Sequence, residues 1–266
     1  MLTGVNLTSF RRLPTIQKLV DDIYANFYEI LIDNFLHLDP DAMKEVVGNK
    51  PLAFHIMWSR FLERDIDELK YISERIKLWS KTLKPLYVSD HLAQFTLQTR
   101  YLPILAELEY RTCYKKVRTR VLMWQDMLES QIAFENFPST LDFNFDQIHF
   151  YQRLIDETRC QLLFDFSNAK IAEINCGSEI SNWQPLLTTV NNFHVAGFRM
   201  SDTNPSLAMD THDVAITAET IEFIKATFCN QFDQNKTIVV ERDANIDYYI
   251  WKQELITIKN AINMGF

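Results

Sequence analysis

The sequence predicts an α/β protein of the (β/α)₈ TIM-barrel class, and two observations lead to that prediction. Eight short runs with β-strand character recur along the chain, and amphipathic stretches with helical spacing lie between them. Strand-then-helix repetition is typical of parallel strands joined by right-handed crossovers, and eight such units are the number that closes a barrel. The length of 266 residues is close to that of one barrel, so we expect a single domain over residues 1–266.

The expected strands run from one end of the chain to the other. They are Leu2–Leu7, Tyr28–Asp33, Leu52–Met57, Pro85–Ser89, Gln131–Glu135, Gln161–Asp165, Asn192–Val195 and Thr237–Glu241. The segment Glu63–Leu83 shows the expected helical pattern, because its apolar residues recur at helical spacing and its charges occupy the other face. No linker rich in Pro, Ser or Gly divides the chain, which supports one domain.

Composition excludes several classes of function. The chain has only five glycines and neither a GxGxxG nor a GxxxxGK[ST] pattern, so we do not expect a glycine-rich phosphate cradle. Its net charge of −8 argues against nonspecific binding of nucleic acid, which favours a basic surface. A hydrophobic content of 47% is typical of a compact globular enzyme.

The segment MLTGVNLTSF lacks the basic start and apolar stretch of a signal peptide, and no run reaches the roughly 18 apolar residues of a membrane span. The four cysteines include no CxxC pair, so a zinc knuckle is not expected. We therefore expect a cytoplasmic protein with no membrane partner and with reduced, mostly buried cysteines, namely Cys113, Cys160, Cys176 and Cys229.

Ionisable and amide side chains gather at the ends of six consecutive expected strands, the third to the eighth. The segments that carry them are LAFHIM, LYVSDHLA, IAFENFP, LLFDFSNAK, NFHVAGF with the following MDTHD, and TIVVERD. The candidate residues are His55, His91, Glu135, Asp165, Asn168, His194, Asp210, His212, Glu241 and Asp243.

Each of these residues has an ordinary explanation when it is taken alone. A single histidine after an apolar run is more often a core histidine than a ligand, and a single acid there can cap the next helix. Six consecutive strands that deliver such groups to one rim are harder to explain, because unpaired charges gathered there would repel one another and lose their hydration. Bound cations remove that cost, so the pattern predicts a metal site.

The donor types narrow the choice of metal. Carboxylates and imidazoles without thiolates favour zinc, iron or manganese over copper(I) or an iron–sulfur cluster. Nine or so donors, at roughly four to six per ion, suit two or three ions. Glu135 has donors on both neighbouring strands, so it is expected to bridge two ions. Two histidines lack this setting: His37 is expected at the surface or behind the ligands, and His149 is expected to pack on a helix.

The order of these residues resembles a known superfamily. The series His, His, Glu, Asp-x-x-(His or Asn), His, Asp-x-His, Glu is similar to the xylose-isomerase-like barrels, including trinuclear zinc endonucleases that cut at abasic sites. The segments SDHLA, FENFPS, HVAGF, DTHD and VERD are more similar to the multinuclear non-haem iron-dependent oxidative enzymes. HIMWSRFLERD, WQDML, LLFDFSNA and ERDANIDY resemble the MbnB-type enzymes of methanobactin biosynthesis, and the resemblance spans nearly the whole chain.

That resemblance implies an activity, cofactors and partners. It implies two or three iron ions, mixed Fe(II)/Fe(III), with dioxygen as co-substrate. It implies oxidation of cysteine residues and their neighbouring amides in a ribosomally made, MbnA-like precursor peptide, which yields the oxazolone and thioamide groups of a copper chelator. It also implies a helper protein, MbnC-like, with which the enzyme forms a heterodimer.

The same resemblance assigns three metal positions. The first is held by His55, His91 and Glu135. The second is held by Glu135, Asp165, His194 and Glu241, with Glu135 as the bridge. The third is held by Asn168, Asp210 and His212. The endonucleases have a histidine at the position of Asn168, and an amide is a weaker ligand, so the third ion is expected to bind more loosely. Asp243 is the candidate catalytic residue, as a base or through a water-mediated contact.

Other functions are compatible with the same residues. A metal-dependent phosphodiesterase or endonuclease would use them to activate water, but 27 Lys and Arg against 35 Asp and Glu disfavour a DNA substrate. A sugar isomerase typically needs a lysine near the carboxylates, and Lys170 is the nearest in sequence. A scaffold that stores metal is the least favoured alternative.

Overall fold

The computed structural model describes residues 1–141, 147–229 and 235–263. It has the predicted (β/α)₈ fold: eight parallel strands close into a barrel in the order β1-β12-β9-β8-β7-β4-β3-β2. The chain divides into two compact units. The first comprises Met1–Ile30, Pro138–Asp142 and Leu163–Phe266, and the second comprises Leu31–Phe137 and Phe143–Leu162. The two units are described in turn.

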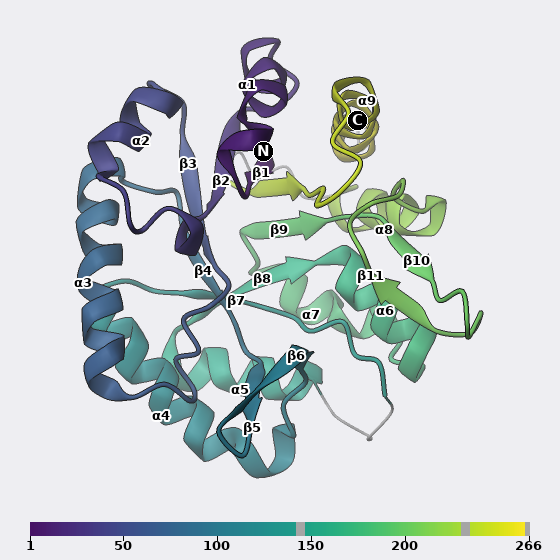
Figure 1. Ribbon diagram of the computed structural model, residues 1–266. Coiled ribbons are helices and arrows are strands. Elements are labelled where there is room, and N and C mark those ends of the chain that lie inside the picture. The colour runs from purple at the N-terminus through teal and green to yellow at the C-terminus, as the bar shows by residue number, and fades with distance from the viewer. Residues whose placement is uncertain (142–146, 230–234, 264–266) are drawn as a thin grey trace. The chain divides into compact units, whose positions relative to one another are not determined.

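The strands of the first unit run parallel to one another (Figure 1). Almost all of their residues are buried. They are β1 (Leu2–Leu7), β2 (Phe27–Leu31, up to Ile30), β8 (Gln161–Asp165, from Leu163), β9 (Asn192–Val195) and β12 (Thr237–Val240). The strand β1 pairs with β2 and β12, β12 pairs with β9, and β9 pairs with β8. This register sets Asp165 beside His194 at the carboxyl ends of their strands.

Helices alternate with these strands. They are η1 (Phe10–Arg12), α1 (Leu13–Asp21), α6 (Phe166–Cys176), η3 (Ile180–Trp183), α7 (Gln184–Leu187), α8 (Ala218–Phe228) and α9 (Tyr248–Asn263). Aromatic rings fill the space between strand and helix: Phe166 stacks on Phe193 at 5.5 Å, and Phe193 meets Phe228 edge-on at 5.1 Å. Trp251 is fully buried, and its indole N–H donates to the carbonyl of Val240, which attaches α9 to β12.

The second unit holds three further barrel strands, β3 (Leu52–Ile56), β4 (Val88–His91) and β7 (Ala133–Glu135). Its helices are η2 (Ile32–Asn34), α2 (Pro40–Val47), α3 (Ile66–Leu83), α4 (Tyr110–Leu128) and α5 (Gln147–Thr158). Acidic side chains cap the starts of α2, α3 and α4, because each accepts a backbone N–H of the first turn. The pairing of β4 with β7 sets His91 beside Glu135.

The expected strands agree closely with the observed ones. Three expected strands coincide with β1, β8 and β9, and those that correspond to β2, β3, β7 and β12 differ from them only at their ends. The remaining expected strand, the fourth along the chain, is misplaced. The fourth, expected at Pro85–Ser89, instead begins at Val88 and continues to His91. The reason is local: Lys84, which caps the end of α3, has a left-handed conformation, so the chain needs the next residues to turn into the strand. The expected helix Glu63–Leu83 begins at Ile66, because Asp65 is its N-cap.

Two antiparallel hairpins were not expected from the sequence. One, β5 (Gln94–Leu97) with β6 (Arg100–Ala106), follows β4, and the other, β10 (Phe198–Met200) with β11 (Ala208–Asp210), follows β9. Their strands are short and largely exposed, so they lack the apolar runs by which buried strands are recognised. Both are insertions in loops at the carboxyl ends of barrel strands.

Two expectations about exposure are settled here. None of the helices in the described ranges combines the length and the apolarity that a membrane crossing requires. The four cysteines, all within the described ranges, are free, but the expectation that most are buried is wrong. Cys160 is buried, Cys113 and Cys176 are half-buried, and Cys229 is exposed.

Candidate metal centre

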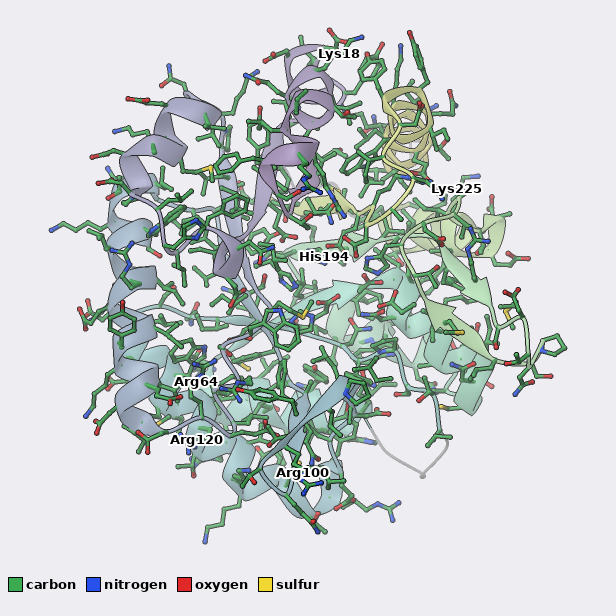
Figure 2. All side chains as sticks on the ribbon, viewed as in Figure 1. Lys18, Arg64, Arg100, Arg120, His194 and Lys225 are labelled. Atoms are coloured by element: carbon green, nitrogen blue, oxygen red, sulfur yellow. The ribbon has the colours of Figure 1, made fainter. Side chains whose placement is uncertain are left out.

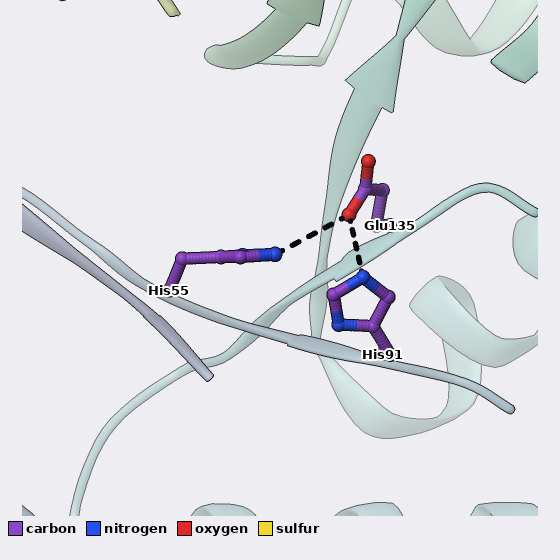
Figure 3. Close-up of side chains that lie close together, drawn as sticks. All are labelled: His55, His91 and Glu135. Atoms are coloured by element: carbon purple, nitrogen blue, oxygen red, sulfur yellow. Dashed lines mark ion pairs between the residues drawn. The ribbon is translucent and has the colours of Figure 1, made fainter. Parts of the chain in front are cut away.

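Three candidate ligands of the second unit converge at the ends of β3, β4 and β7 (Figure 3). One carboxylate oxygen of Glu135, Oε2, lies 3.6 Å from Nε2 of His55 and 3.1 Å from Nε2 of His91. The two imidazole rings meet edge-on with their centres 4.6 Å apart. His55 and Glu135 are buried and His91 is mostly so. Their donor atoms lie close enough to share one ion, and they are the set that the resemblance assigns to the first metal position.

The outer ring nitrogens of these histidines define their protonation. Nδ1 of His91 lies 3.1 Å from the carbonyl oxygen of Ile56, which can only accept, so Nδ1 carries the proton. Ser89 donates its hydroxyl to the carbonyl of Phe54 and accepts from Nδ1 of His55 at 2.8 Å. Each Nε2 therefore faces the carboxylate of Glu135, and a cation bound there would take the place of the proton that lies between the two.

The electrostatics of this cluster agree with that reading. Burial lowers the pKa of His91, but the hydrogen bond and the charge attraction from Glu135 outweigh it and raise the pKa to about 9. The site thus stabilises positive charge at the position between the two side chains.

Fixed contacts hold the strand ends beneath the ligands. Asp90 is fully buried between them, and accepts the indole N–H of Trp124 at 2.9 Å and the backbone N–H of His91 at 2.8 Å. Burial raises the pKa of Asp90 to about 7. The hydroxyl of Tyr151 donates to the backbone carbonyl of Glu135 and so fixes the end of β7. The ligand side chains therefore project from a rigid backbone.

A second group of predicted ligands lies within the first unit, at the ends of β8, β9 and β12. Oε2 of Glu241 lies 3.3 Å from Nδ1 of His194, and Asp165 is paired with His194 in the strand register. Donor atoms of these three residues lie within 4.8 Å of one another. Oδ1 of Asp165 also accepts the backbone N–H groups of Ser167 and Asn168, so Asp165 caps α6 as well. Asp165 thus caps α6, as the ordinary explanation expects, and its role as a metal ligand stays a prediction.

Sequence reasoning missed one residue that contacts this group but is not part of it. Glu29, in β2, is 1% exposed, and its Oε2 lies 2.9 Å from Nε2 of His194, a side chain in the interior of the first unit (Figure 2). The available signal was an acid within the apolar run FYEIL of a strand that is buried on both faces. Charged residues are almost never fully buried unless they are paired, so such an acid indicates a partner in the core.

The third group lies in the loops that follow β9 and β12. Nε2 of His212 is 2.6 Å from Oδ1 of Asp210, and its Nδ1 is 3.1 Å from Oδ2 of Asp243. Arg12 contacts Asp243 with Nη1 at 3.3 Å and also donates to its backbone carbonyl. Burial raises the pKa of Asp243, but the contacts with His212 and Arg12 outweigh it and hold the pKa below its usual value. Asp243 thus braces His212, and its catalytic role stays a prediction.

The remaining candidates are placed as follows. Asn168 is buried in the first turn of α6, next to Asp165. His37 is exposed after η2, as expected for a surface residue. His149 does lie on a helix, α5, but its side chain is exposed, so the packing role expected for it is wrong. The bridging role of Glu135 stays a prediction.

The four candidate histidines share one design. Each has one ring nitrogen beside a fixed acceptor, namely Ser89, the carbonyl of Ile56, Glu29 or Asp243, and the other beside a carboxylate. Histidines that bind metals almost always donate their outer N–H in this way, which fixes the tautomer and the ring orientation. The residues present therefore fit metal ions of the type that carboxylate and imidazole bind.

The tight packing around Gly197 leads to a testable prediction about the loop that carries His212. A Cβ at Gly197, after β9, would overlap the carbonyl group of Val214. We expect Gly197→Ala to cost about 1–3 kcal/mol of stability, because the backbone carrying His212 must shift. The expected loss is measured by denaturant unfolding, together with a drop in bound metal. Gly48→Ala is the control: its φ of +60° strains the variant, but no atoms lie near the new Cβ. Normal metal content in Gly197→Ala would contradict the prediction.

Comparison with known proteins places the chain in a family. A family model described as "RiPP precursor modification enzyme MbnB/TglH/ChrH" matches residues 4–263. A UPF0276 protein of Psychromonas ingrahamii is 25% identical over 250 residues, which cover 88% of this chain and 86% of that protein. A second UPF0276 protein, from Acaryochloris marina, is 26% identical over 192 residues, or 69% of this chain and 68% of that one.

Solved structures support the fold at low identity. L-ribulose 3-epimerase matches with a TM-score of 0.65 and 10% identity over 99% of this chain and 95% of that one. A xylose-isomerase-like TIM-barrel protein from Mycobacterium smegmatis, in complex with magnesium, matches with a TM-score of 0.64 and 11% identity over 99% and 97%. Identity this low shows the fold alone, whereas the family model spans nearly the whole sequence. The chain belongs to the MbnB/TglH/ChrH family of RiPP precursor modification enzymes.

Proposed function

We propose that this chain oxidises cysteine residues of a ribosomally made precursor peptide at a centre of two or three iron ions, with dioxygen as co-substrate. Membership of a family of precursor modification enzymes supports the class of substrate. The observation that carries the proposal is the arrangement of the four histidines, each braced at one nitrogen and directed at a carboxylate with the other. Such an arrangement supports a multinuclear metal centre in particular.

Each of the three groups of side chains described above would hold one ion. His55, His91 and Glu135 would hold one ion, and Asp165, His194 and Glu241 a second. Glu135 would also bridge these two, since active sites of this barrel class lie where the carboxyl ends of the strands meet. Asn168, Asp210 and His212 would hold a third ion, less tightly because an amide is a weak ligand.

The protein's own contribution is to fix which nitrogen of each histidine ring faces the ion. When bound, the irons would supply a Lewis acid for the cysteine thiol and the redox chemistry of dioxygen. His55 and His91 keep a proton on Nδ1 and offer Nε2, whereas His194 offers Nδ1. Because Nδ1 of His55 and of His91 is held by a fixed acceptor, an ion would displace the proton on Nε2 and need not turn the rings. Burial of Glu135, Asp165 and Glu241 excludes water from their carboxylates, whereas Asp210 is exposed.

The finer parts of the proposal concern product and partner. We propose an oxazolone with a neighbouring thioamide as the product, as in methanobactin, and a helper protein of the MbnC type with which the chain forms a heterodimer. A four-electron oxidation removes four hydrogen atoms per modified cysteine, and dioxygen is the acceptor of those electrons. The peptide would therefore lose the mass of four hydrogens while its sulfur is retained.

The proposal is tested by coexpression with a candidate helper and precursor. We expect protein purified anaerobically with iron to contain two or three iron ions per chain. Exposure to oxygen should then lower the peptide mass by four hydrogens per modified cysteine, as measured by mass spectrometry. Tight zinc, no uptake of iron and an unchanged peptide would overturn the proposal.

A second candidate function uses the same donors. A metal-dependent phosphodiesterase of this superfamily would activate water between two ions, and the pairing of carboxylates with histidines suits that chemistry. The net charge of −8 disfavours a DNA substrate. Cleavage of abasic-site DNA by the zinc-loaded protein would support it. An isomerase is not favoured, because Nζ of Lys170, its nearest candidate lysine, lies 2.5 Å from a carboxylate oxygen of Glu173 on α6.

A further inference from the structure

Glu29 is a buried carboxylate that contacts a proposed ligand, His194, without being a proposed ligand itself. It lies in β2, opposite Asn6 of β1 in the strand register, and 1% of it is exposed. It belongs to neither group of donor atoms that could share one ion. Its Oε2 contacts the ring of His194 from the side opposite to Glu241. A charge buried this deeply needs a specific partner, and His194 is one.

The geometry decides which nitrogen of His194 is the ligand. Nε2 lies 2.9 Å from Oε2 of Glu29, and Nδ1 lies 3.3 Å from Oε2 of Glu241. Glu241 stands at the end of β12 among the proposed ligands, whereas Glu29 does not. If Nε2 donates its N–H to Glu29, the lone pair of Nδ1 faces the ion. His194 then binds through the nitrogen opposite to the one that His55 and His91 offer.

We propose that Glu29 is a positioning residue that holds His194 in its Nε2–H tautomer, so that Nδ1 binds the metal. This inference rests on the metal centre of the proposed function and deepens it. The carboxylate fixes the ring plane and makes the imidazole a more basic ligand than a neutral acceptor would. The ring of His194 is held by an acid, Glu29, that lies on another buried strand of the barrel. The other three candidate histidines are held by acceptors of other kinds, namely Ser89, the carbonyl of Ile56 and the loop residue Asp243. The pair spans 165 positions in the sequence.

Two substitutions separate charge from hydrogen bonding. Glu29→Leu removes the acceptor, and we expect the affinity for zinc or ferrous iron to fall about 10- to 100-fold, which is typical when such a partner is lost. Glu29→Gln keeps an acceptor oxygen, so a smaller loss is expected. Glu254→Gln is the matched control, because Glu254 is also a buried acid of the first unit but contacts Arg242 and not a histidine. It should leave metal affinity near that of the wild type.

The second readout is independent of activity and of affinity. In zinc-loaded protein, ¹⁵N NMR of the histidine rings should show His194 protonated at Nε2 and zinc-bound at Nδ1. His194→Gln identifies the signal by its loss. Glu29→Gln should keep this pattern, and Glu29→Leu should lose it. Circular dichroism verifies that each variant is folded.

The outcomes distinguish this inference from the proposed function. Wild-type protein that binds neither zinc nor iron would contradict the metal centre itself. Wild-type protein that binds metal, together with a Glu29→Leu variant of equal affinity and an unchanged ¹⁵N pattern, would refute the positioning role alone. If Glu29→Leu does not fold, the Glu29→Gln spectrum still decides, since zinc bound at Nε2 in the wild type or in that variant contradicts the inference.

Discussion

Replacement of Glu135 by glutamine is expected to abolish turnover of the precursor peptide. Oε2 of this residue faces both His55 and His91, so its loss leaves two imidazole nitrogens without the anion that completes the site. An amide is a weak ligand and carries no charge. Loss of a braced ligand should exceed the 10- to 100-fold that loss of an outer partner costs, so we expect activity to fall more than ~100-fold.

The experiment compares metal content and peptide oxidation in matched variants. Glu129→Gln is the control, because this acid is exposed in the same unit and contacts Lys77 on the surface. The backbone at position 135 should stay in place, since Tyr151 donates to its carbonyl and not to its side chain. Full metal occupancy and normal turnover of Glu135→Gln would show that the cluster of the second unit is not the reactive centre.

Removal of metal is expected to destabilise the fold by several kcal/mol. Without cations, the buried acids Glu135, Asp165 and Glu241 keep charges that have lost their hydration, and their attraction to the ions is lost. Mass action sets the scale: a ligand at 1,000 times its dissociation constant stabilises the native state by about 4 kcal/mol. The effect is measured by denaturant unfolding with and without a chelator, at fixed pH and salt.

Variants identify the source of that stabilisation. In Glu135→Gln, the chelator should lower the free energy of unfolding by less than in the wild type, because the metal position of the second unit is already impaired. In Glu129→Gln, the chelator should lower it by as much as in the wild type. A chelator that leaves both the midpoint and the slope of wild-type unfolding unchanged, while it strips the metal, would show that the acids are accommodated without ions. Such a result would also remove the physical argument for the centre.

The barrel strands were predictable because parallel strands buried on both faces read as short apolar runs. β1, β8 and β9 match their expected bounds, and each is buried along nearly its whole length. The fourth strand was placed too early, because the left-handed conformation of Lys84, the residue that caps α3, cannot be recognised from the apolar pattern. The strands of the two hairpins each have at most one buried residue, so they lack the apolar run that marks a buried strand.

Exposure of single side chains was harder to predict. His149 has apolar neighbours in sequence on both sides, yet its side chain is exposed on α5. Cys229 likewise follows a buried phenylalanine at the end of α8 and is itself exposed. Neighbours along a helix point in different directions, so local hydrophobicity alone does not decide the burial of one residue.

The sequence by itself determined the fold class and which acids and histidines stand at the strand ends, because both follow from the local succession of apolar runs and polar residues. Only the tertiary structure decided which ring nitrogen of each histidine is braced and that Glu29 belongs beside His194. The physical reason is that a hydrogen bond between residues 165 positions apart is set by strand register and ring orientation. Neither the strand register nor the ring orientation can be predicted from the residues that surround Glu29 or His194 along the chain.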